Sequence, residues 1–283
     1  MHGRDWDQFL IPYEQAVEEL KVKFRSIRSE LKRKMEYSPI EFVTGRVKKV
    51  SSILEKAKKL GIPQERPEEV PDIAGIRIMV QFVDDIYRVV QLIHQRNGKD
   101  MTIVEEKDYV KNTKESGYRS YHIVIRYPLQ TANGEKSILA EIQIRTLAMN
   151  FWATIEHSLS YKYQGNIPQD IKDRLRNAAE AAFRLDEEMS QIREEIREAQ
   201  RHFEMKSNQV LTLLRDIERL YDLGRVVEAI TFQKEFHDKS GDLDQLTELA
   251  GKVREALCSA SHPSSLHAGE NHQTCGNDES DKE

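Results

Sequence analysis

Residues 137–152 read SILAEIQIRTLAMNFW, and the first half of this stretch alternates as a β-strand does. Because side chains of a strand point to its two faces in turn, four apolar residues share one face: Ile138, Ala140, Ile142 and Ile144. The other face carries Glu141, Gln143 and Arg145. A solvated outer face explains this pattern, and so does a ligand-binding face. The rest of the chain decides between the two interpretations.

The bulk composition predicts a soluble protein with a core of its own. The 283 residues are 32% charged and 39% hydrophobic, and the formal net charge is -5. This balance argues against a protein that holds DNA or RNA by bulk charge. Residues 44–59 nevertheless hold six bases and one acid. Such a local excess suits a polyanionic ligand of limited size, and a solvated helix face explains it equally well.

The sequence carries no pattern typical of secretion or of a membrane span. The N-terminal residues lack an apolar run, and no segment approaches the ~18 apolar residues of a spanning helix. The two cysteines, Cys258 and Cys275, lie close to the C-terminus and predict no disulfide framework. We therefore expect a cytoplasmic protein.

Hydrophobic periodicity predicts an α+β fold with a mixed central sheet of about five strands, flanking helices and extra C-terminal helices. The expected strands cover residues 40–48, 70–82, 101–105 and 120–127, followed by the strand quoted above. The expected helices cover residues 6–35, 49–60, 84–96, 146–163 and 170–203, with two or three more over residues 210–257. We predict a first domain over residues 1–205, a helical extension of unknown role over residues 206–257, and a disordered tail over residues 258–283.

Two carboxylates fall where they could share a metal ion. Asp72 lies at the start of one central strand, and Glu141 lies in the middle of another. Mg²⁺ that is bound to nucleotide phosphates usually takes one or two protein carboxylates, so this pair suits Mg²⁺ if the strands are neighbours. An aspartate before a strand is also a common turn residue, which leaves both interpretations open.

A strand and the helix after it carry a cluster of bases. Arg46 and Lys48 share a face of the strand, and Lys48, Ser52 and Lys56 recur at four-residue steps. A helix start adds free N–H groups and the positive end of the dipole, which suits a polyphosphate bound without a glycine-rich loop. Arg46 and Arg77 carry planar guanidinium groups that could stack on a purine. Many surface helices carry lysines at such steps, so the spacing alone is suggestive.

A polar loop over residues 111–119, KNTKESGYR, precedes the fourth strand. Gly117 lets the backbone approach a ligand closely. Tyr118 offers an aromatic plane close to the basic Lys114, and His122 follows on the strand. This set suits a nucleobase stacked above its phosphates, although a buried tyrosine and a hydrogen-bonded core histidine would give the same pattern.

Four segments together resemble a known family. They are GRVKKVSSILEK (residues 45–56), PDIAGIRI (71–78), ESGYRSYH (115–122) and AEIQIRT (140–146). In this order they resemble the synthetase domain of the (p)ppGpp synthetases, especially the short RelQ-type small alarmone synthetases. The resemblance covers about residues 6–203. It implies a nucleotidyltransferase-like synthetase fold that transfers pyrophosphate from ATP to the 3′-hydroxyl of GDP or GTP for the stringent response, without hydrolysing the product.

The resemblance also implies roles for individual residues. On the donor side, Arg46 and Arg77 would sandwich the adenine, and Lys48, Ser52 and Lys56 would hold the ATP phosphates. Asp72 and Glu141 would hold Mg²⁺, with Glu141 as general base. On the acceptor side, Tyr118 would stack on guanine, while Lys114 and His122 would meet phosphates and Gln143 and Asn150 would make further contacts. Arg119 and Arg145 could equally be structural.

RelQ-type proteins assemble as homotetramers through flanking helices and can bind their product in a central cleft. The resemblance therefore implies a homotetramer that uses the helices over residues 6–35 and 170–203. For a regulatory product site, the candidate residues are Lys21, Arg25, Phe42 and Thr44.

Other interpretations fit parts of the sequence. Asp242 and Asp244 have the spacing of an enzyme that transfers AMP, but they lack the Gly-Ser turn that usually precedes such a pair. A tetramer that binds single-stranded RNA through residues 44–59 could coexist with synthesis. The tail has a spacing that could bind zinc, although a disordered tail is favoured. Its candidate ligands are Cys258, His262, His267, His272 and Cys275.

Overall fold

The computed structural model describes residues 5–162, 167–239 and 243–261. They form two compact units, of which the first ends at Glu194 and the second begins at Glu195. Asp242, Cys275 and the three tail histidines lie outside the described residues. Within the described ranges, every helix is too short or too polar to span a lipid bilayer.

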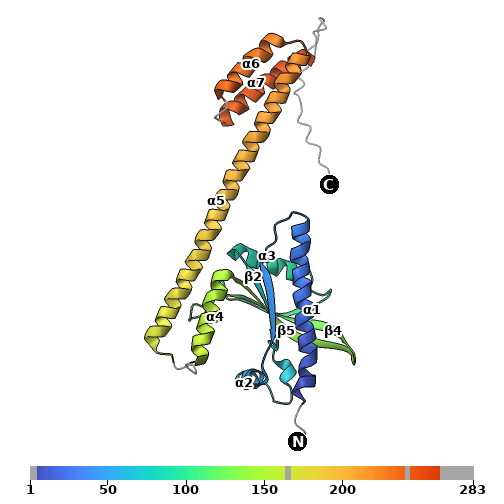
Figure 1. The fold of residues 1–283 in the computed structure, drawn as a ribbon, viewed down its shortest axis with the longest axis vertical. Coiled ribbons are helices and arrows are strands. Elements are labelled where there is room, and N and C mark those ends of the chain that lie inside the picture. Colours follow the sequence, from blue (N-terminus) through green and yellow to red (C-terminus); the bar gives the residue numbers. More distant parts are fainter. Residues whose placement is uncertain (1–4, 163–166, 240–242, 262–283) are drawn as a thin grey trace, which may run out of the picture. The chain divides into compact units, whose positions relative to one another are not determined.

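The first unit is built on a five-stranded sheet with the order β1-β2-β5-β4-β3. The strands are β1 (Phe42–Val47), β2 (Ala74–Val80), β3 (Thr102–Asp108), β4 (Tyr121–Thr131) and β5 (Gly134–Thr146). β2 and β5 run parallel, and the other neighbouring pairs are antiparallel. This confirms the predicted mixed sheet, with the strand quoted first at its centre (Figure 1).

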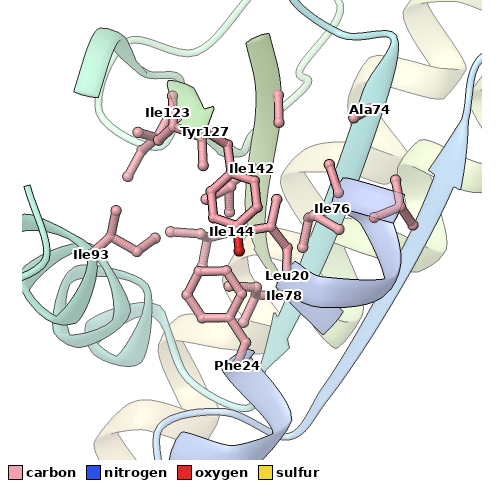
Figure 2. Close-up of a cluster of buried hydrophobic side chains, with 14 of the residues drawn as sticks. Leu20, Phe24, Ala74, Ile76, Ile78, Ile93, Ile123, Tyr127, Ile142 and Ile144 are labelled. Carbon is pink, nitrogen blue, oxygen red and sulfur yellow. The ribbon is translucent and has the colours of Figure 1, made fainter. Parts of the chain in front are cut away.

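One face of the sheet is covered by α1 (Trp6–Arg33) and α3 (Val83–His94) (Figure 1). Leu20 and Phe24 from α1 and Ile93 from α3 meet the isoleucines of β2 and β5 in this core (Figure 2). Gly45 of β1 allows α1 to come close, because a β-carbon there would lie 2.7 Å from Cγ1 of Val17. The predicted apolar face of β5 is therefore buried, and its polar face points to the other side of the sheet.

Three further helices belong to the first unit. They are α2 (Val50–Leu60), the short 3-10 helix η1 (Pro67–Glu69) and α4 (Leu147–Lys162). Two of them, α2 and α4, follow the expected ranges, whereas the short η1 was not expected. β3 ends at Asp108, so the expected end at Glu105 is wrong. The charged residues beyond Glu105 obscured this end, since an edge strand with a bulge after Ile103 keeps no clean apolar alternation.

Helix α5 runs from Gln169 to Asp222, so the expected helix end at Phe203 is wrong. Residues 169–222 contain neither glycine nor proline, and Gly224 is the first residue beyond the helix with a left-handed backbone. The end of α5 packs with α6 (Val226–Lys239) and α7 (Leu243–Ser261) in the second unit. The core of this unit contains Leu213, Ile217, Leu220, Ala229, Leu246, Leu249 and Val253.

Candidate active site

The polar face of the sheet carries a row of side chains that crosses all five strands. The register joins Thr44 to Arg77, Arg77 to Gln143, Gln143 to His122, and His122 to Lys107. A second row joins Arg46 through Gly75 to Glu141. Directly opposed residues on neighbouring strands present their side chains on the same face. The register thus brings motifs from separate segments onto one surface.

Glu141 and four neighbouring side chains close a ring of hydrogen bonds. His122 Nδ1 donates to Glu141 Oε1 at 3.0 Å, and the Tyr118 hydroxyl donates to His122 Nε2 at 2.7 Å. Arg145 donates to the Tyr118 hydroxyl and, at 2.8 Å, to Oε1 of Gln143. Gln143 Nε2 donates to Glu141 Oε2 at 2.5 Å. The ring holds each of these side chains in one orientation, with the histidine proton assigned to Nδ1.

Glu141 is ionised at neutral pH. Burial by itself raises the pKa of this carboxyl, but the hydrogen bond from His122, with that from the amide of Gln143, outweighs burial and lowers the pKa to about 2. An ionised carboxylate can bind a cation, and one of such low basicity is a weak acceptor for a proton.

Asp72 lies in the same cleft as Glu141. The two carboxylates line a cavity of about 130 Å³ together with Thr44, Arg46 and Arg77. Lys48 and Lys56 both contact Asp72 Oδ2, the second at 3.4 Å. The other oxygen, Oδ1, is buried and has no hydrogen-bond partner among the described residues. A buried carboxylate oxygen without a donor is suited to a cation.

A larger pocket of about 560 Å³ shares Arg46, Arg77 and Gln143 with this cleft. The rest of its lining includes Lys114, Tyr118 and Arg145, and α4 adds Thr154, Glu156 and His157. Burial lowers the pKa of Arg77, and the charges of Arg145 and Arg46 lower it further. Burial and the charge of Lys56 lower the pKa of Lys114. Cations crowded in this way are stabilised by a polyanionic ligand.

Five of the predicted substrate residues line the cleft or the pocket, and they are Arg46, Arg77, Lys114, Tyr118 and Gln143. Lys48 and Lys56 reach the site through Asp72, and His122 reaches it through Glu141. The other two predicted residues lie on neighbouring helices. Ser52 lies half-buried on α2, between the positions of Lys48 and Lys56. Asn150 lies on α4, and its Oδ1 is buried without a partner among the described residues. Neither side chain is among the residues that line the cleft or the pocket.

The loop before β4 is attached to α5. Gly117 has a φ of +85°, and a β-carbon there would lie 2.6 Å from Cβ of Ala179. The sequence analysis expected this glycine to approach a ligand, but its close approach is made to α5 instead. Arg119 donates to Glu180 at 3.1 Å and lies 4.1 Å from the ring centre of Phe183. These contacts give Arg119 a structural role in holding the loop.

The candidate regulatory residues surround the edge strand β1. Arg25 of α1 donates to the backbone carbonyl of Val43 at 3.1 Å, and Lys21 lies along Gly45 on the same side. Phe42 and Thr44 point to the opposite face of β1, where Thr44 lines the cleft with Asp72. Within one chain, the four candidates therefore lie on both sides of one strand.

Besides residues of α4, the sequence interpretation overlooked Tyr109 and Lys107, which lie close to the predicted acceptor residues. The ring of Tyr109 contacts those of Tyr118 and His122, with centres 6.1 Å and 5.2 Å apart. The ammonium group of Lys114 lies 4.4 Å from the ring centre of Tyr109 and 4.9 Å from that of Tyr118. Lys107 faces His122 across the strands. Both residues follow Glu105 at two-residue steps, so a longer β3 would have indicated them.

Comparisons with known proteins agree with this arrangement. Residues 45–166 match the family model described as a region found in RelA / SpoT proteins. The chain is 61% identical over 206 residues to GTP pyrophosphokinase YjbM of Bacillus subtilis (strain 168), covering 73% of this chain and 97% of that relative. It is 40% identical over 195 residues to GTP pyrophosphokinase YwaC of the same organism, covering 68% of this chain and 92% of that relative.

Solved structures give the same result. The small alarmone synthetase 1 from Bacillus subtilis bound to its product pppGpp has a TM-score of 0.65 and 61% identity, covering 69% of this chain and 99% of that chain. The same synthetase bound to AMPCPP has a TM-score of 0.62 and 60% identity, covering 69% and 100%. The chain therefore belongs to the RelA/SpoT family. Within that family it is a GTP pyrophosphokinase of the small alarmone synthetase type.

Proposed function

We propose that the chain transfers the pyrophosphoryl group of ATP to the 3′-hydroxyl of GDP or GTP. The hydroxyl oxygen forms a bond to the β-phosphorus, the bond to the bridging oxygen of the α-phosphate breaks, and AMP leaves. The products are ppGpp or pppGpp. The observation that carries this proposal is the joining of a cationic pocket of about 560 Å³ to a cleft that holds Asp72 and Glu141.

The donor half of the site would bind ATP. Arg46 and Arg77 lie on adjacent strands and line both the cleft and the pocket, which supports the proposal that their guanidinium groups would enclose the adenine. Lys48 and Lys56 meet at Asp72 and would hold the phosphates. Ser52, one turn before Lys56 on α2, is the third candidate for this contact.

The acceptor half would bind the guanine nucleotide. Tyr118 is held by Arg145 and His122, which fixes its ring as a platform for guanine. Lys114 lies between the rings of Tyr109 and Tyr118 and would move to the acceptor phosphates. A lysine whose pKa is lowered by burial and by neighbouring cations gains most from an anion.

Asp72 and Glu141 are the residues that would hold Mg²⁺. The buried Oδ1 of Asp72 and the ionised carboxylate of Glu141 fit such an ion, and the remaining ligands would be phosphate oxygens and water. When bound, Mg²⁺ would neutralise charge on the transferred phosphates.

Glu141 would also accept the proton of the attacking hydroxyl. Its pKa of about 2 makes it a weak base, so its basicity would rise only when substrate displaces His122 or Gln143 from its oxygens. Because phosphoryl-type transfer depends mainly on positioning and charge neutralisation, a weak base is sufficient. His122 then has a second role, since it holds the carboxylate ionised before the substrates bind.

The direct test is incubation with [γ-³²P]ATP, Mg²⁺ and GDP or GTP, followed by thin-layer separation. Labelled ppGpp or pppGpp with free AMP supports the proposal, whereas release of labelled pyrophosphate indicates AMP transfer instead. Glu141→Gln should lower the rate by roughly 10³-fold or more, and an active variant would remove the assigned role. We also propose synthesis without hydrolysis, so purified ppGpp should remain intact with the enzyme and Mg²⁺ or Mn²⁺.

We propose a homotetramer assembled through α1 and α5. Ile11 and Val22 on α1 are 56% and 60% exposed, and α5 exposes Leu185, Met189, Ile192 and Ile196 along one stripe. Such apolar stripes on helices favour association with another helix. Light scattering after gel filtration should give four times the chain mass, and a monomer would contradict this proposal.

Single-stranded RNA is proposed as a regulator that binds the basic surface of residues 44–59. The exposed Lys49, Lys58 and Lys59 lie there on or beside α2. RNA binding that is lost in Lys48→Ala and kept in Glu141→Gln would support this partner. Equal binding by both variants would contradict it.

A further inference from the structure

Glu156 of α4 stands out in the large pocket because its charge is opposite to that of its neighbours. Among the described residues that line this pocket, it is the one carboxylate, whereas Arg46, Arg77, Lys114 and Arg145 are cations. A carboxylate repels phosphate and accepts hydrogen bonds. Glu156 is therefore suited to a part of the ligand that carries N–H donors, which in a nucleotide is the base.

The packing of α4 places Glu156 beside the platform formed by Tyr118. The Tyr118 ring packs with Trp152 and Ala153, and Trp152 Nε1 donates to the carbonyl of Leu175 at 2.8 Å, which fixes this part of α4. Glu156 follows Trp152 by four residues and Ala153 by three, so it lies on the same side of the helix. Both Glu156 and Tyr118 line the pocket.

The carboxylate of Glu156 is also oriented. Ser160 Oγ, one turn further along α4, donates to Glu156 Oε1 at 2.7 Å. Glu156 itself is half-buried. A partly buried carboxylate with one oxygen held by a neighbour is prepared to accept directional hydrogen bonds.

We propose that Glu156 selects guanine as the acceptor base by accepting hydrogen bonds from its N1–H and exocyclic N2 amino group. These two donors are adjacent, so they match the two oxygens of one carboxylate. Adenine has an acceptor at N1 and cannot make this pair. The proposal rests on the proposed function and specifies how its acceptor half recognises the base.

The test compares kcat/KM for GDP, IDP and XDP, because IDP lacks the N2 amino group and XDP has an oxygen in its place. Wild type should prefer GDP over IDP by about tenfold or more. In Glu156→Gln this ratio should fall to within about threefold. In the same variant, the ratio of kcat/KM for XDP to kcat/KM for GDP should be at least about tenfold higher than in wild type. The reason is that an amide can donate a hydrogen bond to the xanthine oxygen. These ratios do not depend on the fraction of folded enzyme.

Glu115→Gln is the matched control. Glu115 lies in the neighbouring loop and shares a second cavity with Glu156, but it does not line the large pocket, so this variant should keep the wild-type ratios. If Glu156→Gln keeps the wild-type ratio of GDP to IDP, the proposal is wrong. If the variant is folded but inactive, equilibrium binding of GDP, IDP and XDP measures the same ratios. A wild type that forms no product from GDP would contradict the proposed function itself.

Discussion

His122 Nδ1 lies 3.0 Å from Glu141 Oε1, and this contact does more than any other neighbour to keep the Glu141 carboxyl ionised. In His122→Phe, burial continues to act on the carboxyl while the opposing hydrogen bond is lost, so the pKa of Glu141 should rise from about 2. Titration of the ¹³Cδ signal of labelled glutamate measures this shift. Tyr118→Phe leaves the contact in place and should move the pKa less. An unchanged titration in His122→Phe would show that the contact does not control Glu141.

The depressed pKa of Glu141 has a consequence for stability. Its ordinary value is 4.5, so its contribution to folding is present above pH 4.5 and is lost as the pH falls toward 2. His122→Phe should therefore make the stability of the protein less dependent on pH within this window. Urea denaturation at several pH values compares the two proteins.

Asp72→Asn tests the cation site. The variant keeps the size of the side chain but removes the charge that faces Lys48 and Lys56. We expect the Mg²⁺ concentration for half-maximal rate to rise by about tenfold or more. Glu135→Gln, in the exposed hairpin end of β5, is the control. A lower rate with unchanged Mg²⁺ dependence would mean that Asp72 serves only to position the two lysines.

Gly117→Ala should destabilise the first unit. The left-handed backbone costs about 1–2 kcal/mol for a residue with a β-carbon, and the contact with Ala179 adds about 1–3 kcal/mol. When Ala179→Gly is combined with Gly117→Ala, the free energy of unfolding that was lost to the contact should be recovered. Gly98→Ala, with a φ of +74° and open space around it, should show the backbone cost alone. Equal losses in Gly117→Ala and Gly98→Ala would contradict the role of Ala179.

Both tryptophans, Trp6 and Trp152, belong to the first unit, so fluorescence during urea denaturation follows the unfolding of that unit. The second unit contributes no tryptophan signal to the measurement. This separation matters because a chain with two compact units need not unfold in a single step.

The raised pKa of Asp186 predicts that the folded protein loses stability as the pH rises. Burial raises the pKa of this carboxyl to about 6, while Thr146 Oγ1 donates to it at 2.6 Å. Since the folded value exceeds the ordinary 3.8, stabilisation is complete below pH 3.8 and is lost as the pH rises through 6. Asp186→Asn should therefore be more stable than wild type at pH 8, by up to about 3 kcal/mol. Equal stabilities at pH 8 would contradict the shifted pKa.

Alternation along β5 made one face of the site predictable. It placed Glu141, Gln143 and Arg145 together, because period two is a property of the backbone. The hydrogen-bonded ring was not predictable, since it depends on the register that sets Gln143 opposite His122. The placement of Asp72 beside Glu141 could not be predicted either, because it depends on β2 and β5 being neighbours in the sheet.

Glu156 and His157 were missed for a different reason. They lie on a helix whose polar side looks like any solvated face, and only the packing of Trp152 and Tyr118 brings them to the pocket. The full length of α5 was in principle predictable, because residues 169–222 hold no helix breaker. The change of apolar spacing near Met205 obscured it.

The parallel pairing of β2 with β5 also determines at which stage of its synthesis and folding a chain can become active. β3 and β4 lie between these two strands in the sequence, and such long-range pairing forms late because a long loop must close first. A nascent chain that has emerged only through β4 has its lysines and Asp72 but not Glu141. Synthesis of the product must therefore await release of the final strand from the ribosome, so a partly translated copy is inactive.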